Sequence, residues 1–412
     1  MVLLPGLLSL SSPEMVMATE PQFHGYLSQA AIRSTDNPYF DDESGTNFNF
    51  REIGLNLAWS ATDQLRLAGQ VLSRKAGDLE DGDPSIDFLL VDYNFLATEE
   101  LSAGIRLGRV KSPYGIYNTT RDVPHGRPGI FVPQSVYFES TRGAILSSDG
   151  GNFYLSNTNS VADFNFDLFG GKVSFDNAAV EYQIYQTDMP GKIEGGDLGG
   201  IRLEILPKAM PDLTVAVTTM DIQGIRYEDA PVLTPAERLS AAVTLANDPS
   251  QYADFITSMK IDVFMMLYSL QYEWRDLIFT TEYLDIDIDI HDFEVIHLPL
   301  PDREVSLLGY YFQTEWLVSN RYSVYARYEE LYYNKDDKSG KEFAELTGGN
   351  PVTQYNKALT LGARWYYTPD FSLTAELSRN TGAAFINGQA NIDYSALKED
   401  WNLLMLQVAY HF

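Results

Sequence analysis

The sequence contains no cysteine among its 412 residues, which excludes disulfide bonds, thiolate metal sites and cysteine nucleophiles. Histidine is also scarce, because only five are scattered along the chain. No Gly-x-Ser-x-Gly segment occurs, and the histidines lack serine or acidic partners at a catalytic spacing. We therefore expect no cofactor and no enzymatic activity.

Positive charge is in short supply, with 29 basic against 57 acidic residues and a net charge of −28. A nucleic-acid partner is not expected, because binding of phosphates requires a basic face. The same deficit means that charge does not draw the chain to anionic lipid. Contact with lipid would have to come from apolar side chains.

Long hydrophobic runs are missing too, so the sequence predicts no transmembrane helix. The first residues have a different character. An apolar stretch, Val2 to Leu10, is followed by small residues that end at Ala18. This pattern predicts a signal peptide over 1–18, cleaved after Ala18, although no basic residue precedes Arg33. Residues 19–412 are then expected to form a single domain.

Aromatic residues are abundant, with 26 tyrosines and 22 phenylalanines, and tyrosine suits the boundary between membrane and water. Apolar residues alternate with polar ones in many segments. From Leu359 to Tyr367 every second residue is apolar or aromatic, and the residues between them are mostly polar. Alternation with period two indicates a strand with one apolar face. The same pattern recurs at 65–71, 101–108, 308–316, 324–329 and 371–378.

The connectors between these segments alternate in length. Short ones occur at 61–63, 97–100, 274–276, 319–321 and 369–370, and long polar ones at 36–46, 75–85, 113–148, 228–259, 335–356 and 384–400. A soluble β-sandwich gives no reason for this asymmetry. We therefore predict an all-β, antiparallel up-and-down transmembrane barrel of a Gram-negative outer membrane, with long extracellular loops and both termini in the periplasm.

Counting back from the C-terminus gives 16 strands, or 18 if residues 178–185 form a strand rather than part of a loop. The connector 228–259 departs from the general pattern. Thr234-Pro235-Ala236-Glu237 is a capping box, and Asp248-Pro249 repeats its start. We expect two short helices there, which either cover the mouth, contact a neighbouring protomer or decorate the surface.

The last strand, from Trp401, alternates apolar residues and ends on Tyr410 and Phe412. This ending resembles the signal that outer-membrane assembly machinery recognises, because an extended edge can pair with an open edge of that machinery.

Charged residues occupy the opposite faces of the predicted strands. They remain hydrated only if that face lines a polar lumen, so the pattern predicts a water-filled channel for small polar solutes. These predicted lining residues are Glu52, Arg66, Asp92, Arg106, Arg202, Glu204, Glu282, Glu315, Arg327, Glu329, Arg364 and Glu376.

The segment from Gly108 to Gly115, with the pattern Gly-Arg-x-Lys-x-Pro-x-Gly, precedes a loop rich in charge and proline. It resembles the end of a strand that leads into the third loop of the porin superfamily, including the phosphate-selective porin O and P group. Residues 23–27 resemble a first porin strand. The resemblance implies a homotrimer and a third loop folded into the barrel as a constriction, with candidates Arg109, Lys111, Arg121, Asp122, His125 and Arg127.

Fixed charges at a constriction select ions by sign. Arg121 and Asp122 either select ions in this way or pin the loop to the wall. A further acidic run, Asp285, Asp287 and Asp289, either binds divalent cations together with lipopolysaccharide phosphates or is a solvated strand end.

Three functions follow from these patterns. The first is passive diffusion through a porin in the outer membrane, surrounded by lipid and lipopolysaccharide. The second is a substrate-specific channel, selective for anions or phosphate. The third is a receptor or adhesion barrel whose long loops bind an external partner.

Overall fold

Alternating side chains build sixteen long strands in the computed structural model of the chain, which describes residues 20–174, 177–187, 189–386, 388–390 and 392–412. The expected signal peptide lies outside these residues. The barrel strands are β1 (Gln22–Ser34), β2 (Thr46–Ser60), β3 (Leu65–Ala76), β4 (Asp81–Ala97), β5 (Leu101–Lys111), β6 (Ser147–Thr158), β7 (Ala162–Lys172), β9 (Asp197–Pro207), β10 (Leu213–Glu228), β11 (Ile256–Trp274), β12 (Leu277–Val295), β14 (Arg303–Ser319), β15 (Tyr322–Tyr332), β16 (Tyr355–Thr368), β17 (Phe371–Gly382) and β18 (Asp400–His411).

Each strand pairs antiparallel with its neighbours, and β1 pairs with β18 to close the ring. Backbone hydrogen bonds between Gly25 and Phe412 extend that closing pair to the last residue. Closure matters because a sheet edge inside a membrane would leave backbone groups without hydrogen bonds. The predicted up-and-down barrel of 16 strands is confirmed.

Two further strands are short additions to the same sheet, β8 (Lys192–Glu194) and β13 (Leu298–Pro299). Residues 178–185, which left the strand count open, belong to the helix α2 (Asn177–Tyr185). The alternative of 18 barrel strands is therefore wrong. Within the part of the chain that the structure describes, no helix is long and apolar enough to cross a membrane.

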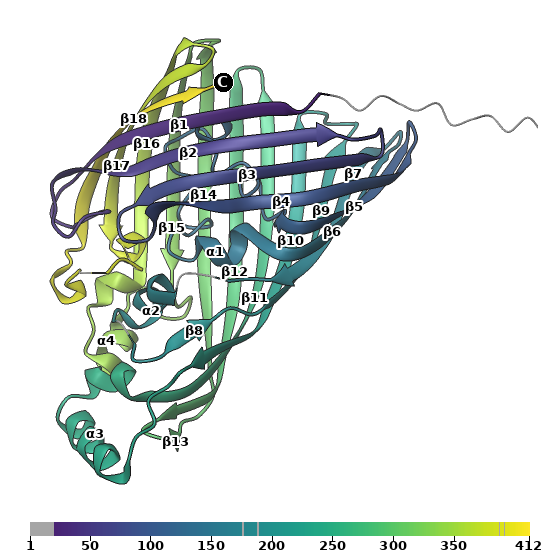
Figure 1. Cartoon of the computed structure of the whole chain (residues 1–412). Coiled ribbons are helices and arrows are strands. Elements are labelled where there is room, and N and C mark those ends of the chain that lie inside the picture. Colours follow the sequence, from purple (N-terminus) through teal and green to yellow (C-terminus); the bar gives the residue numbers. More distant parts are fainter. Residues whose placement is uncertain (1–19, 175–176, 188, 387, 391) are drawn as a thin grey trace, which may run out of the picture.

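Short turns join the strands at one end of the barrel, and the long loops and helices gather at the other (Figure 1). The loop after β10 contains α3 (Pro235–Asn247) and the 3₁₀ helix Pro249–Phe255, as the sequence predicts. Thr234 and Glu237 form the expected capping box, in which the Thr234 N–H donates to the Glu237 carboxylate over 2.7 Å. The predicted long connector 75–85 is instead mostly strand, because β3 and β4 run on to Ala76 and Asp81.

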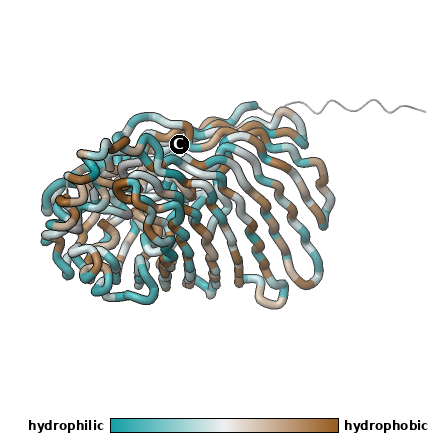
Figure 2. Tube along the Cα trace, turned by 90° about the horizontal axis from the view of Figure 1, so that it is seen from below, coloured by the Kyte–Doolittle hydropathy of each residue, from teal (hydrophilic) through white to brown (hydrophobic). Residues whose placement is uncertain are grey.

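The remaining short helices lie in other long loops. They are α1 (Arg142–Leu146), α4 (Lys341–Thr347) and the 3₁₀ turns Pro124–Gly126, Pro351–Gln354, Ala384–Ile386 and Tyr394–Ala396. Hydrophobic and hydrophilic residues alternate along the strands that Figure 2 shows. Leu55, Leu89, Leu361 and Leu406 lie on the outer face and are more than half exposed. Such an apolar outer surface suits lipid.

The alternation inverts part of the way along β12. On the short-turn side of Leu284 the outward side chains include Phe279 and Tyr283. On the long-loop side Asp285 and Asp287 point outward, and Ile286 points inward. An aspartate row would be costly against lipid, so the outer boundary of the membrane lies near this inversion. Beyond that boundary the long strands β11, β12 and β14 stand in water and enclose an apolar core with the loops.

We predict that an added lysine destabilises the barrel on the membrane side of this inversion but not on the long-loop side. Leu361→Lys places an ammonium in the apolar outer band and is expected to lower the free energy of unfolding by about 2–4 kcal/mol. The control, Glu304→Lys, lies on the exposed outer face of β14 opposite Asp289, on the long-loop side of the boundary. It should cause no loss in the free energy of unfolding. Urea unfolding in lipid vesicles, followed by tryptophan fluorescence, measures both changes. Equal losses in the two variants would contradict the assigned boundary.

Candidate functional site

The strand register places the predicted lining residues on one face of the sheet. Arg66 lies opposite Asp92, and Asp92 lies opposite Arg106 on the next strand. On the far side of the barrel Glu376 is the strand partner of Gly362, and Gly362 is the strand partner of Tyr325. Residues paired across strands point to the same side. By this register all twelve point inward: Glu52, Arg66, Asp92, Arg106, Arg202, Glu204, Glu282, Glu315, Arg327, Glu329, Arg364 and Glu376.

Toward the short turns, the inner wall forms a vestibule with polar side chains that solvent reaches. Arg66 is exposed, and Arg202, Glu204 and Glu315 are partly exposed. Arg106 lies 3.4 Å from Asp92 through its Nε atom, so opposite charges adjoin each other on this wall. The vestibule therefore has the hydrated lining that a polar conduit requires.

Toward the long loops, the lumen is occupied by the third loop, residues 112–146, which folds inward as the resemblance implies. Inward-facing Leu267, Leu284 and Tyr311 are completely buried against it. The Glu282 carboxylate accepts hydrogen bonds from the Ile116 N–H over 3.0 Å and from the Tyr137 hydroxyl over 2.6 Å. This wall glutamate thus holds both arms of the loop.

Four other predicted lining residues also hold the loop. The Ser135 N–H donates to Glu329 over 3.0 Å, and the Ile130 N–H donates to Glu376. Arg327 donates to a carbonyl of the loop over 3.2 Å, and Arg364 donates to two of its carbonyls over 3.0 and 3.3 Å. These side chains are nearly fully buried, so their charges are compensated by hydrogen bonds to the loop backbone and by neighbouring groups.

Charged residues of the loop itself are paired in the interior. Arg121 donates to Glu139 over 2.8 Å, and Arg127 donates to Glu52 over 2.6 Å. Asp122 is fully buried and accepts from Lys111 over 2.5 Å and from Arg142. Of the two roles left open for Arg121 and Asp122, this geometry supports pinning of the loop.

The structure separates Arg109 from the other constriction candidates. Its guanidinium lies on the outer face of β5 and pairs with Asp149 across 2.8 Å, because Arg109 is in register with the outward-facing Leu89. His125 lies at the loop tip, where its ring stacks on His411 with centroids 4.1 Å apart. Arg109 is therefore not brought together with Lys111, Asp122 and Arg127.

The predicted acidic run also faces outward, above the membrane boundary. Lys335 lies 3.3 Å from Asp285 and 3.6 Å from Asp287. Among the residues that the structure describes, no group of three or more histidines or acidic residues could hold a metal ion. At the other end of the barrel, Tyr410 on β18 and Phe412 just after it are exposed on the outer face, and their rings stack with centroids 6.1 Å apart.

Sequence reasoning missed several charged contacts of the loop, which join it to the end of β3 and to the connection between β3 and β4. Arg74, nearly fully buried at the end of β3, lies 2.7 Å from Glu80, pairs with Glu139 and lies 3.5 Å from Glu52. Arg142 in α1 adds a contact to Glu80 of 3.4 Å. Their charges within or next to the connectors 75–85 and 113–148 were the only signal, and it did not specify the pairs.

These groups form a polar seam between the loop and the wall of β3 to β5. On that wall Asp87 accepts from Gln70 over 2.6 Å and lies 2.9 Å from Lys111. Two apolar clusters lie on either side, one around Tyr137 and one around Phe131. We define the polar seam as Gln70, Arg74, Asp87, Lys111, Asp122, Glu139 and Arg142.

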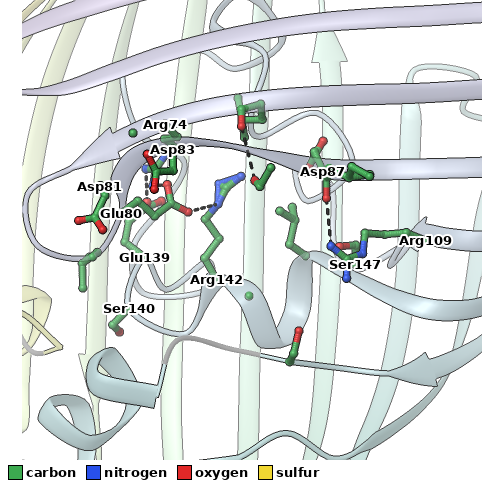
Figure 3. Close-up of a pocket in the computed structure, with 18 of the residues that line it drawn as sticks. Arg74, Glu80, Asp81, Asp83, Asp87, Arg109, Glu139, Ser140, Arg142 and Ser147 are labelled. Carbon is green, nitrogen blue, oxygen red and sulfur yellow. Dashed lines mark hydrogen bonds and ion pairs between the residues drawn. The ribbon is translucent and has the colours of Figure 1, made fainter.

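A cavity of about 460 Å³ opens beside the seam (Figure 3). The connection between β3 and β4 forms one side, and the base of the third loop with α1 forms another. Figure 3 shows Arg74, Glu80, Glu139 and Arg142 together at this cavity, with an ion pair drawn between Glu80 and Arg142. The outward-facing Arg109 and Asp149 also line the cavity, so the seam connects through it to open space that reaches the outer face of β5 near the long loops.

No protein-family model matches the sequence, and no curated protein is significantly similar to it. Solved structures do match over nearly the whole chain. The anion-selective porin from Comamonas acidovorans is 10% identical, with 96% of this chain and 100% of that chain covered and a TM-score of 0.57. The outer membrane channel DcaP of Acinetobacter baumannii is 10% identical, with 96% and 98% covered and a TM-score of 0.55.

OmpT of Vibrio cholerae is 11% identical, with 95% of this chain and 97% of that chain covered and a TM-score of 0.54. The chain has the fold of the outer-membrane porins. Identities this low establish the fold alone, so the function must be argued from the side chains.

We predict that the loop tip loosens in acid. Burial, and then the neighbouring His411, Arg364 and Arg127, lowers the pKa of His125 to about 4. Exposed histidine titrates near pH 6.5, so packing of the tip is fully favoured above that value and weakens as pH falls toward 4. Asp370, 4.0 Å from His411, is the nearby acidic group. Protection factors of amides 119–128 against hydrogen exchange, compared at pH 7 and pH 5, measure this loosening.

The variant His125→Gln removes the titrating ring at the tip, so the acid-induced loss of protection should disappear. If His125→Gln loses as much protection in acid as the unmodified chain, the pH dependence belongs to other groups.

Proposed function

We propose that this chain forms a channel through which small polar solutes diffuse across the outer membrane. One observation carries the proposal. The inner wall is polar and hydrated at one end, and a loop held by wall glutamates narrows it at the other. Charged side chains at such a depth remain in water only if the barrel interior is wet. Passive conduction needs no catalytic group.

The path that we propose follows the polar seam. The third loop lies against β11, β12 and β14 to β18, and it also contacts β2 through the pair of Arg127 and Glu52. Against β3 and β5 the loop is held by ion pairs, of Arg74 with Glu139 and of Lys111 with Asp122, rather than by apolar packing. Solutes would therefore pass through this polar interface, from the vestibule around Arg66 and Arg106 to the cavity of Figure 3. Lys111, Asp87 and Asp122 form the narrowest part of this proposed path.

A substrate-specific channel is the second candidate, and the cavity beside the seam favours it over a receptor barrel. One structural neighbour is named an anion-selective porin. We carry over from the porin fold the expectations of a homotrimer, of lipopolysaccharide around the outer rim, and of recognition of Tyr410 and Phe412 by the assembly machinery.

The channel is tested in planar lipid bilayers with the purified barrel. We expect discrete ion-conducting steps, because polar side chains continue from the exposed vestibule through the buried seam, where water and ions would pass between them. Gly309→Ala should raise the single-channel conductance, since a Cβ at Gly309 would collide with the backbone carbonyl of Ser135 and displace the third loop. Gly199→Ala is the matched control, because its Cβ would meet no atom within 4 Å.

Absence of conducting steps in the unmodified barrel would overturn the channel. If Gly309→Ala conducts like the Gly199→Ala control, the third loop does not limit the passage.

A further inference from the structure

The cavity beside the polar seam carries more negative than positive side chains. Its charged lining consists of six acidic and four basic residues, namely Glu80, Asp81, Asp83, Asp87, Glu139, Asp149, Arg74, Arg109, Arg142 and Lys172. Asp81 and Asp83 are exposed at the rim on β4 and make no ion pair with the described residues. A solute that approaches from the side of the long loops therefore meets uncompensated carboxylates first.

The arginines of the lining are already engaged with acidic groups. Arg74 pairs with Glu80, Glu139 and Glu52, and Arg142 pairs with Glu80 and Asp122. Glu52 and Asp122 are not part of the cavity lining, so they supply negative charge from behind it. Arg109 is held by Asp149 in a pair with two contacts of 2.8 Å. Among the described residues, Lys172 is the one basic group of the lining without an ion pair, and elsewhere an anion would have to compete with the existing pairs.

Asp87 provides a second and independent observation. Its side chain is 5% exposed and lines the cavity (Figure 3), and its Oδ1 atom has no hydrogen-bond partner. The other oxygen, Oδ2, accepts from Gln70 and lies 2.9 Å from Lys111. A buried carboxylate oxygen without a donor is costly, and a bound cation with N–H groups would satisfy it.

We propose that this cavity is a binding site for small organic cations that carry a primary ammonium group, and that it is the mouth through which they reach the seam. Asp81 and Asp83 attract the cation, and Asp87 Oδ1 accepts a hydrogen bond from its ammonium. The cavity volume accommodates a molecule of several carbon atoms. The transport part of this inference rests on the proposed channel, whereas binding at the cavity does not.

Binding is tested by isothermal titration calorimetry on the folded barrel in detergent. The probe is 1,5-diaminopentane, and pentane-1,5-diol and glutarate are the neutral and anionic controls of the same length. We expect binding of the diamine alone. Neutralising the rim with Asp81→Asn and Asp83→Asn should weaken it roughly two- to fivefold per carboxylate, as for exposed ion pairs. Asp87→Asn should weaken it on the order of tenfold, as for a hydrogen bond to a charged group.

A matched control is the pair Asp63→Asn and Asp276→Asn, exposed aspartates in the short turns at the opposite end. Binding that is unchanged in the rim variant, or equally weakened in the control pair, would overturn the site. The exposed rim variant keeps the test valid even if Asp87→Asn does not fold.

Bilayer recordings separate this inference from the channel itself. With the diamine on the side of the long loops, the unmodified barrel should show block of its current, and the rim variant should show less. Conduction without diamine binding would refute the cation site and leave the channel standing. Diamine binding in a barrel that does not conduct would refute the channel and leave the site standing.

Discussion

Four wall glutamates, Glu52, Glu282, Glu329 and Glu376, hold the third loop inside the barrel, and the shape of the lumen depends on these contacts. Each is almost completely buried and accepts hydrogen bonds from the loop, either from backbone N–H groups or from side chains. Burying a carboxylate without donors would be strongly unfavourable, so the loop and the glutamates stabilise each other. Replacing one of these glutamates by an apolar residue would leave buried donors of the loop without an acceptor.

The position of the loop determines which part of the lumen is filled by apolar packing and which part stays polar. The loop covers the wall from β11 around to β2, and its apolar side chains fill the space there with packed clusters. Polar side chains stay together on the opposite wall, from Gln70 to Lys111. A barrel of this width cannot be filled by wall side chains alone. The inward loop therefore converts a wide lumen into a polar seam beside a packed interior.

Much of the barrel could be predicted from the period of its sequence. Alternation identifies an inner and an outer face without knowledge of neighbours, and the strand register places Glu282 and Arg364 on the inner face. The same rule does not reveal which medium each face meets. Asp285 points outward because β12 extends beyond the membrane, where the apolar face turns inward against the loops.

The site itself could be predicted only in part. The inward loop was inferred from resemblance to porins, and that inference included Arg109, whose register with Leu89 turns it outward. Pairs such as Arg74 with Glu139 join connectors far apart in the chain. Such pairs depend on the path of the loop in three dimensions, which no local pattern encodes.

The central claim is that solutes pass between the third loop and β3 to β5, and a cysteine-free chain allows a direct test. Gln70→Cys and Ser269→Cys place one thiol in the seam and one on the covered wall, equally far from the short-turn ends of β3 and β11 and similarly buried. A charged methanethiosulfonate reagent should reduce the single-channel current through Gln70→Cys and leave Ser269→Cys unchanged. A reduced current through Ser269→Cys alone would contradict the account.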